Sequence, residues 1–233
     1  MNNILIHVPH ASTFIPDEYK NQFISAPDHL AHEAELSADL YTDILAREAW
    51  PNAEIIAAEF SRLLVDVERY DDDELEEMAR VGRGMIYKSA HDGVRIRREI
   101  SSEERHVLHE RYYKPHWERL KSVAANKLLI DLHSYPKVPW PIELMQDSDR
   151  PEIDLGTAAH LTPKKWVDDM KSHFEDHGYT VGINTPYSGV IDAGSKHAVM
   201  IELRRDIIST PSSGKKWGKM VDALASMPMP VMD

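Results

Sequence analysis

Short apolar runs alternate along this chain with longer stretches of helical spacing. The runs typical of buried strands are Ile4–Val8, Ala53–Ala58, Leu63–Val67, Lys127–Leu132, Tyr179–Ile183 and Ala198–Leu203. Helical spacing covers His29–Trp50, Ser101–Lys121 and Pro163–Asp176. This alternation predicts one α/β domain over residues 1–233, a three-layer αβα sandwich around a mixed, mostly parallel sheet.

Composition narrows the classes of function. The chain has no cysteine, which excludes a disulfide scaffold, a cysteine nucleophile and any cysteine-ligated metal. Its 27 Lys and Arg against 39 Asp and Glu give a net charge of −12. That charge argues against binding to nucleic acid or to an anionic membrane. The N-terminus lacks the basic and apolar regions of a signal peptide, so we expect a cytoplasmic protein.

Three of the predicted strands deliver polar side chains at or near their carboxyl ends, where α/β enzymes place their chemistry. They are His10, His133 and Glu202. Two imidazoles plus one carboxylate are the usual ligands of a catalytic zinc ion, so the sequence predicts a site for zinc or another divalent metal. Glu202 suits the role of general base, although pairing with Arg204 or Arg205 is an alternative. Asp131 shares a strand face with His133 and is expected to orient that imidazole.

Arginines bracket the run at 63–67. Arg62 and Arg69 are candidates for binding a substrate carboxylate, because a guanidinium grips a carboxylate with two parallel hydrogen bonds. Ion pairing with Asp66, Glu68 or the acidic run after Tyr70 is the equal alternative. That acidic run is interpreted as a solvated loop leading into a helix. The histidines of the long helix, 106, 109 and 116, are expected at the surface or at an interface, and residues 184–189 form either a substrate loop or only a connecting loop.

Six motifs in order resemble the N-formylglutamate amidohydrolase family. They are Val8-Pro9-His10-Ala11-Ser12, Ala38-Asp39-Leu40-Tyr41-Thr42-Asp43, Ser61-Arg62 through Asp66-Val67-Glu68-Arg69, Asp131-Leu132-His133-Ser134, Asn184-Thr185-Pro186-Tyr187-Ser188-Gly189 and Met200-Ile201-Glu202. The resemblance spans roughly Ile4 to Arg205. It implies a fold related to the zinc carboxypeptidases and aspartoacylase, and hydrolysis of a small anionic N-acyl amino acid such as N-formyl-L-glutamate.

The resemblance also implies roles for individual residues. Carboxypeptidases take a Glu three residues after the first zinc histidine, but Thr13 stands there, so the third ligand must lie elsewhere. Asp39 matches the family best, with Glu35 as the alternative. Arg62 and Arg69 would hold the substrate carboxylate and help to stabilise the oxyanion. Ser134, Asn184 and Tyr187 would also contact substrate.

Two alternatives stay open on the sequence. The same chemistry could serve another acidic amide, as in carboxypeptidases or aspartoacylase, or the chain could be a non-catalytic relative that binds metal or ligand. The family's Pro-aromatic-His motif reads Pro115-His116-Trp117 here, with the histidine displaced by one residue, so no role is carried over to His116.

Overall fold

The computed structural model describes residues 3–208, 210–211 and 214–232. Its centre is a six-stranded sheet in the order β2-β1-β3-β6-β4-β5. The strands are β1 (Ile4–Val8), β2 (Glu54–Ala57), β3 (Leu128–Tyr135), β4 (Ile153–Gly156), β5 (Val181–Ile183) and β6 (His197–Arg204). β1 pairs in parallel with β2 and with β3, and β3 pairs in parallel with β6, whereas β4 is antiparallel to β6 and parallel to β5. The sheet is therefore mixed and mostly parallel, as predicted.

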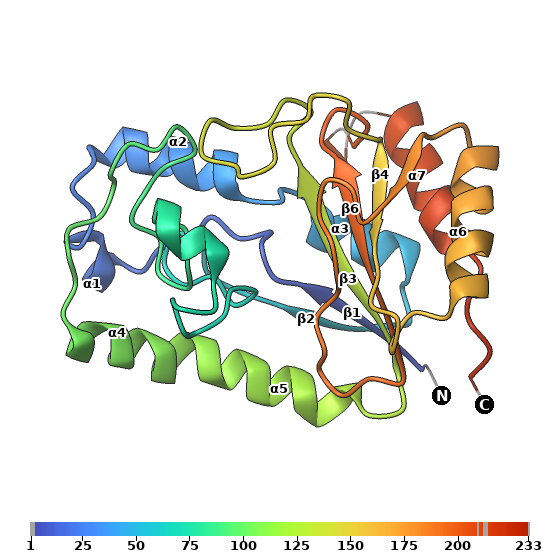
Figure 1. The fold of residues 1–233 in the computed structure, drawn as a ribbon, viewed down its shortest axis with the longest axis horizontal. Helices are drawn as coiled ribbons and strands as arrows, with labels where there is room; N and C mark the ends of the chain where they lie inside the picture. Colours follow the sequence, from blue (N-terminus) through green and yellow to red (C-terminus); the bar gives the residue numbers. More distant parts are fainter. Residues whose placement is uncertain (1–2, 209, 212–213, 233) are drawn as a thin grey trace.

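Helices cover both faces of this sheet (Figure 1). They are α1 (Asp17–Lys20), α2 (Pro27–Ser37), α3 (Thr42–Ala49), α4 (Ser102–Leu108), α5 (Lys114–Ala124), α6 (Lys164–Asp176) and α7 (Lys215–Ala225), with a 3₁₀ helix η1 (Glu77–Val81) and a π-helical turn η2 (His109–Tyr113). α3, α6 and α7 pack on one face and α5 on the other. The predicted three-layer α/β fold is confirmed. No helix of the described residues is long and apolar enough to cross a membrane.

Alternation along the strands decides which side chains face α5. In β3, Leu128, Ile130 and Leu132 belong to the core under α3, α6 and α7. Asp131 and His133 therefore project toward α5, because successive strand residues point to opposite faces. Glu202 of β6 is in register with His133, and parallel partners share a face. The polar residues of the two central strands thus collect on the α5 side of the sheet.

The predicted helix at 29–50 is interrupted. α2 ends at Ser37, Ala38 is extended, and Tyr41 adopts a left-handed conformation with φ of 69° before α3 begins. The interruption is held from outside, because the Asp39 amide donates to the His10 carbonyl at 2.8 Å. Helical spacing of apolar residues continues across the break, so the sequence pattern does not reveal it.

The predicted strand Leu63–Val67 is wrong. This segment is a series of turns whose amides bond to Ser61 and to the Met85 carbonyl rather than to a strand. Its four apolar side chains are all buried in a second core with α1, α2 and α4. An apolar run signals burial, and burial alone does not distinguish a strand from compact turns.

Other differences lie at element ends or in missed elements. β5 begins at Val181 rather than Tyr179, and Pro163 precedes α6 as its N-cap. β4, α1 and α7 were not predicted from the sequence. The capping box that starts the long helix is present as predicted, with Ser101 and Glu104 each bonding to the other's backbone.

Candidate active site

Three buried donor atoms meet near the carboxyl ends of β1 and β3. His10 Nδ1 lies 3.2 Å from His133 Nδ1, and Asp39 Oδ2 lies 3.5 Å from the first and 3.3 Å from the second. All three residues are at most 3 % exposed. His10 follows β1, His133 lies within β3, and Asp39 occupies the break between α2 and α3. The structure thus brings together the three residues predicted as metal ligands.

The donor set fits a divalent metal such as zinc. Ligands at the usual zinc distances of about 2.0–2.1 Å lie about 3.3–3.4 Å apart in a tetrahedral arrangement. The observed separations of 3.2, 3.3 and 3.5 Å match that spacing. Glu35, the alternative ligand, is exposed on α2 and does not belong to this group of donors.

Each imidazole turns its other nitrogen toward a buried carboxylate. His10 Nε2 donates to Asp66 Oδ1 at 2.8 Å. His133 Nε2 lies 3.0 Å from Asp131 Oδ1 and 3.3 Å from Glu68 Oε2. Burial opposes protonation, yet these carboxylates and Asp39 hold the pKa of His133 well above its usual value. Carboxylates that favour a proton at this position also favour a metal cation.

Glu202 stands beside this group on β6. It is 8 % exposed, and its Oε2 has no hydrogen-bond partner among the described residues. Burial raises the pKa of Glu202 to about 8, with His133 opposing the shift and Asp39 and Asp154 adding to it. The alternative pairing with Arg204 or Arg205 is not observed, because Arg204 pairs with Asp206 and Arg205 with Asp39. A carboxyl group with such a pKa is suited to exchange protons near neutral pH.

Arg62 and Arg69 both approach Asp66, but differently. Arg62 donates to Asp66 Oδ2 through Nε at 3.0 Å and Nη2 at 2.8 Å. Arg69 makes longer contacts, with Nε 3.7 Å from Asp66 Oδ2 and Nη1 3.8 Å from Glu76 Oε1. Its buried Nε has no hydrogen-bond partner among the described residues. The ion-pair interpretation therefore describes Arg62 well, while Arg69 retains hydrogen-bonding capacity.

The role of Asp66 was not predicted from the sequence. It is fully buried and also accepts from the Tyr87 hydroxyl at 2.8 Å. Burial would raise the pKa of Asp66, but Arg62, His10 and Arg69 hold it well below the usual value. The sequence signal for Asp66 was its place between Arg62 and Arg69. That place is consistent equally with an ion pair and with a hydrogen bond to a metal-binding histidine.

His7 and His116 were also missed. His7 on β1 is fully buried, with Nδ1 2.9 Å from Asp131 Oδ1 and Nε2 2.8 Å from His116 Nε2. Burial opposes its protonation, but Asp131 and Glu68 raise the pKa of His7 to about 9. His116 of α5 is buried rather than at the surface, which corrects the expectation for this histidine. His7 is the one polar residue in the apolar run Ile4–Val8, and in the parallel sheet it pairs with Asp131. That polar residue within a strand was the signal that could have identified it.

Two residues predicted to contact substrate are already engaged within the protein. Ser134 donates to Asp39 Oδ1 at 3.3 Å. Asn184 accepts from the backbone amides of Thr157 and Gly189 and so ties together the loops that follow β4 and β5.

Tyr187, the third of these residues, lies on the loop after β5. Its hydroxyl donates to Glu143 Oε2 at 3.0 Å, and its amide donates to Asp154, the β4 neighbour of Glu202. The loop therefore reaches the vicinity of Glu202 through Asp154.

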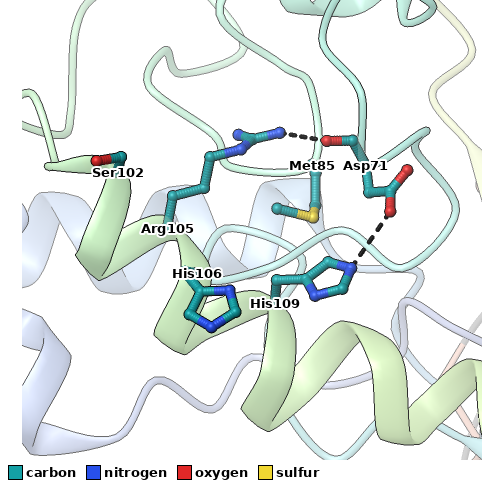
Figure 2. Close-up of a pocket in the computed structure, with 6 residues that line it drawn as sticks. All are labelled: Asp71, Met85, Ser102, Arg105, His106 and His109. Carbon is teal, nitrogen blue, oxygen red and sulfur yellow. Dashed lines mark hydrogen bonds and ion pairs between the residues drawn. The ribbon is translucent and has the colours of Figure 1, made fainter.

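A separate pocket lies between the acidic run and α4 (Figure 2). It is lined by Asp71, Met85, Ser102, Arg105, His106 and His109. Arg105 donates to the Asp71 carbonyl, and His109 Nε2 lies 3.2 Å from Asp71 Oδ2. These contacts anchor the acidic run to the long helix, in agreement with its interpretation as a loop. None of the proposed metal ligands lines this pocket.

Comparison with known proteins supports the family. The sequence model of the N-formylglutamate amidohydrolase family matches residues 2–209. The fold is similar to that of an N-formylglutamate amidohydrolase from Ralstonia eutropha JMP134, with a TM-score of 0.79, 24 % identity and coverage of 96 % of this chain and 90 % of the other. It is also similar to that of a gene product of Agrobacterium tumefaciens, with a TM-score of 0.73, 20 % identity and coverage of 97 % and 88 %.

No curated protein sequence gives a significant match. The family match covers most of the chain, and the fold agrees with it over nearly the whole length. The chain belongs to the N-formylglutamate amidohydrolase family and is thus a hydrolase of amide bonds.

Proposed function

We propose that this protein hydrolyses N-formyl-L-glutamate, or a closely related N-acyl amino acid, to formate or the corresponding acid and the free amino acid. The observation that carries the proposal is the buried group of His10 Nδ1, His133 Nδ1 and Asp39 Oδ2 beside Glu202, whose Oε2 has no hydrogen-bond partner among the described residues. Such a group in a member of this family is best explained by metal-assisted hydrolysis with a carboxylate base.

Zinc or another divalent metal held by His10, Asp39 and His133 would supply Lewis acidity and lower the pKa of a water molecule toward 7. Glu202 accepts the proton of the attacking water at Oε2 and then donates it to the leaving amine. The buried Asp66 accepts a hydrogen bond from Nε2 of His10. This hydrogen bond holds the imidazole proton on Nε2 and leaves Nδ1 unprotonated.

Arg69 is the residue best placed to bind a substrate carboxylate. Its side chain is 29 % exposed, its ion pairs are long, and its Nε has no hydrogen-bond partner among the described residues. Arg62, fixed on Asp66, contributes positive charge beside it and helps to stabilise the oxyanion. A local cationic wall allows a protein of net charge −12 to receive an anionic substrate.

The test is formate release from N-formyl-L-glutamate by purified, zinc-loaded protein. We expect turnover that a chelator abolishes and added zinc restores. Glu202→Gln should lower kcat by about 10²–10⁴-fold, because proton transfer is lost while the metal ligands remain. Glu118→Gln is the control, since the Glu118 side chain is exposed on α5 and makes no ion pair or hydrogen bond with the described residues.

The outcomes separate the alternatives. Turnover that is insensitive to chelator, or an active Glu202→Gln variant, contradicts the mechanism. Higher kcat/KM for N-acetyl-L-aspartate or a C-terminal peptide than for N-formyl-L-glutamate would keep the chemistry but change the substrate. Zinc binding without turnover of any of these amides would indicate a non-catalytic relative.

A further inference from the structure

The two oxygens of the Asp39 carboxylate face different surroundings. Oδ2 faces the two histidines, 3.3 Å from His133 Nδ1 and 3.5 Å from His10 Nδ1. Oδ1 accepts a hydrogen bond from Arg205 Nη2 at 3.1 Å and another from Ser134 Oγ at 3.3 Å. Oδ2 therefore faces the two imidazoles that would share a cation with it, whereas Oδ1 is occupied by Arg205 and Ser134.

Arg205 is itself held in place. Its Nε donates to Ser134 Oγ at 3.2 Å, and its Nη1 donates to the Leu36 carbonyl at 2.6 Å. Because α2 ends at Ser37, that carbonyl has no amide of its own helix to accept from. The guanidinium also lies over the Trp140 ring, 5.3 Å from its centroid. Each nitrogen of Arg205 thus has a specific acceptor, and together they connect the end of α2 to β3 and β6.

We propose that Arg205, together with Ser134, is a positioning residue that makes Asp39 a one-oxygen ligand of the divalent metal. The inference rests on the metal site of the proposed function. A carboxylate can bind a metal through one oxygen or through both. Occupying Oδ1 with a charged and a neutral donor disfavours the second mode. Coordination positions are thereby left for water and substrate, as a catalytic site requires.

Arg204 provides the matched comparison. It precedes Arg205 in the chain and carries the same group, but it pairs with Asp206 at 2.7 Å and donates to the Arg150 carbonyl. It makes no described contact with Asp39. Loss of Arg204 therefore reports the general effect of removing an arginine at the end of β6, without disturbing the ligand.

The experiment measures metal binding without turnover. Zinc affinity is determined by competition with a chromophoric chelator for wild type, Arg205→Gln, Arg205→Lys, Ser134→Ala and Arg204→Gln. We expect Arg205→Gln to bind zinc about 10–100-fold more weakly, as is usual when a partner of a metal ligand is lost. Ser134→Ala should show a smaller loss, Arg205→Lys partial recovery, and Arg204→Gln an affinity within about twofold of wild type.

The visible absorption of the cobalt-substituted proteins tests the binding mode. Cobalt in Arg205→Gln should show weaker bands than in wild type, because binding by both oxygens of Asp39 raises its coordination number. A merely structural role of Arg205 would leave this spectrum unchanged. If Arg205→Gln fails to fold, judged by circular dichroism of the metal-free protein, Ser134→Ala carries the same test.

The failure of this inference differs from failure of the proposed function. Wild-type protein that does not bind zinc contradicts the metal site itself. If the wild type binds zinc and Arg205→Gln has the same zinc affinity and the same cobalt spectrum, the positioning role is refuted and the metal site stands. An equal loss of affinity in Arg204→Gln and Arg205→Gln also refutes it.

Discussion

Glu202 shows how strongly one residue can depend on its surroundings. Its carboxyl is buried, one oxygen has no hydrogen-bond partner among the described residues, and burial raises its pKa to about 8. Ionising such a group costs free energy that an exposed glutamate does not incur. A residue that carries this cost at the end of a central strand is better explained by chemistry than by stability.

The cost is measurable in the metal-free protein. Between the ordinary glutamate pKa of 4.5 and the native value of about 8, the native state holds a proton that the unfolded chain releases. Stability contributed by this proton therefore falls as the pH rises through that window. We expect metal-free Glu202→Gln to have a higher free energy of unfolding than wild type at pH 9, by a few kcal/mol. The difference should shrink as the pH is lowered toward 4.5.

Urea unfolding of both metal-free proteins at several pH values checks this prediction. The control is Glu118→Gln, which makes the same substitution at an exposed position of α5. A wild-type protein more stable than Glu202→Gln at pH 9 would contradict the assignment.

At the scale of elements, two that were not predicted from the sequence, β4 and α7, each contain a glycine, for different reasons. Gly156 ends β4, and a Cβ there would lie 2.3 Å from the Gly189 carbonyl oxygen and 2.3 Å from Met200 Cε. Gly218 lies in α7, where a Cβ would meet no atom within 4 Å. The first glycine is required by the close approach of a neighbouring loop, whereas the second only lowers helix propensity.

Alanine at the two positions should have opposite effects. Gly218→Ala is expected to raise the free energy of unfolding by about 0.5–1 kcal/mol, since alanine favours a helix. Gly156→Ala is expected to lower it by about 1–3 kcal/mol, because backbone and Met200 must move. Urea titrations followed by circular dichroism give both values. Stabilisation by Gly156→Ala would show that the loop after β5 does not pack on β4 as described.

The break between α2 and α3 is the element on which the site depends. A continuous helix from 29 to 50 would leave Asp39 within regular helical backbone. Instead, the His10 carbonyl accepts a hydrogen bond from the Asp39 amide, and the Thr42 hydroxyl donates to the Asp39 carbonyl at 2.7 Å. Asp39, the proposed ligand, is thus held by hydrogen bonds to His10, which follows β1, and to Thr42 at the start of α3.

At the scale of the whole molecule, the sheet links the separate cores. Ile6 and Val8 of β1 belong to the core beneath α3, α6 and α7, whereas Leu5 belongs to the core beneath α5. A second core lies beside the sheet under α1, α2 and α4, and it buries the segment that carries Asp66. Since the proposed site draws ligands and their partners from both regions, we propose that residues 1–233 form one folding domain.

A single domain should unfold in one cooperative step. We expect the thermal transitions followed by far-ultraviolet circular dichroism and by tryptophan fluorescence to coincide. The tryptophans suit this purpose, because Trp166 and Trp217 lie in the core under α6 and α7, while Trp117 packs against the α5 core. Two resolved transitions would show that the region of α1, α2 and α4 unfolds separately.

Sequence patterns captured the residues that lie on or directly after strands. His10, His133 and Glu202 were recognisable because each follows or ends an apolar run, and strand ends converge in α/β sheets. Asp39 was reached only through family resemblance, since its place inside a helical pattern gives no local sign of a ligand. The prediction of a strand at 63–67 was wrong because an apolar pattern reports burial and not backbone geometry.

The sequence by itself determined the α/β class, the family, the absence of cysteine ligands and the kinds of side chain at the strand ends. The tertiary structure alone decided which partner each side chain meets. His10 and His133 are 123 positions apart, and Arg205 lies 166 positions from Asp39. The support of His10 by Asp66, the burial of His7 and His116, and the division of the Asp39 oxygens arise only when the sheet assembles. Local propensities act over a few residues, whereas these contacts join segments that only the packed core brings together.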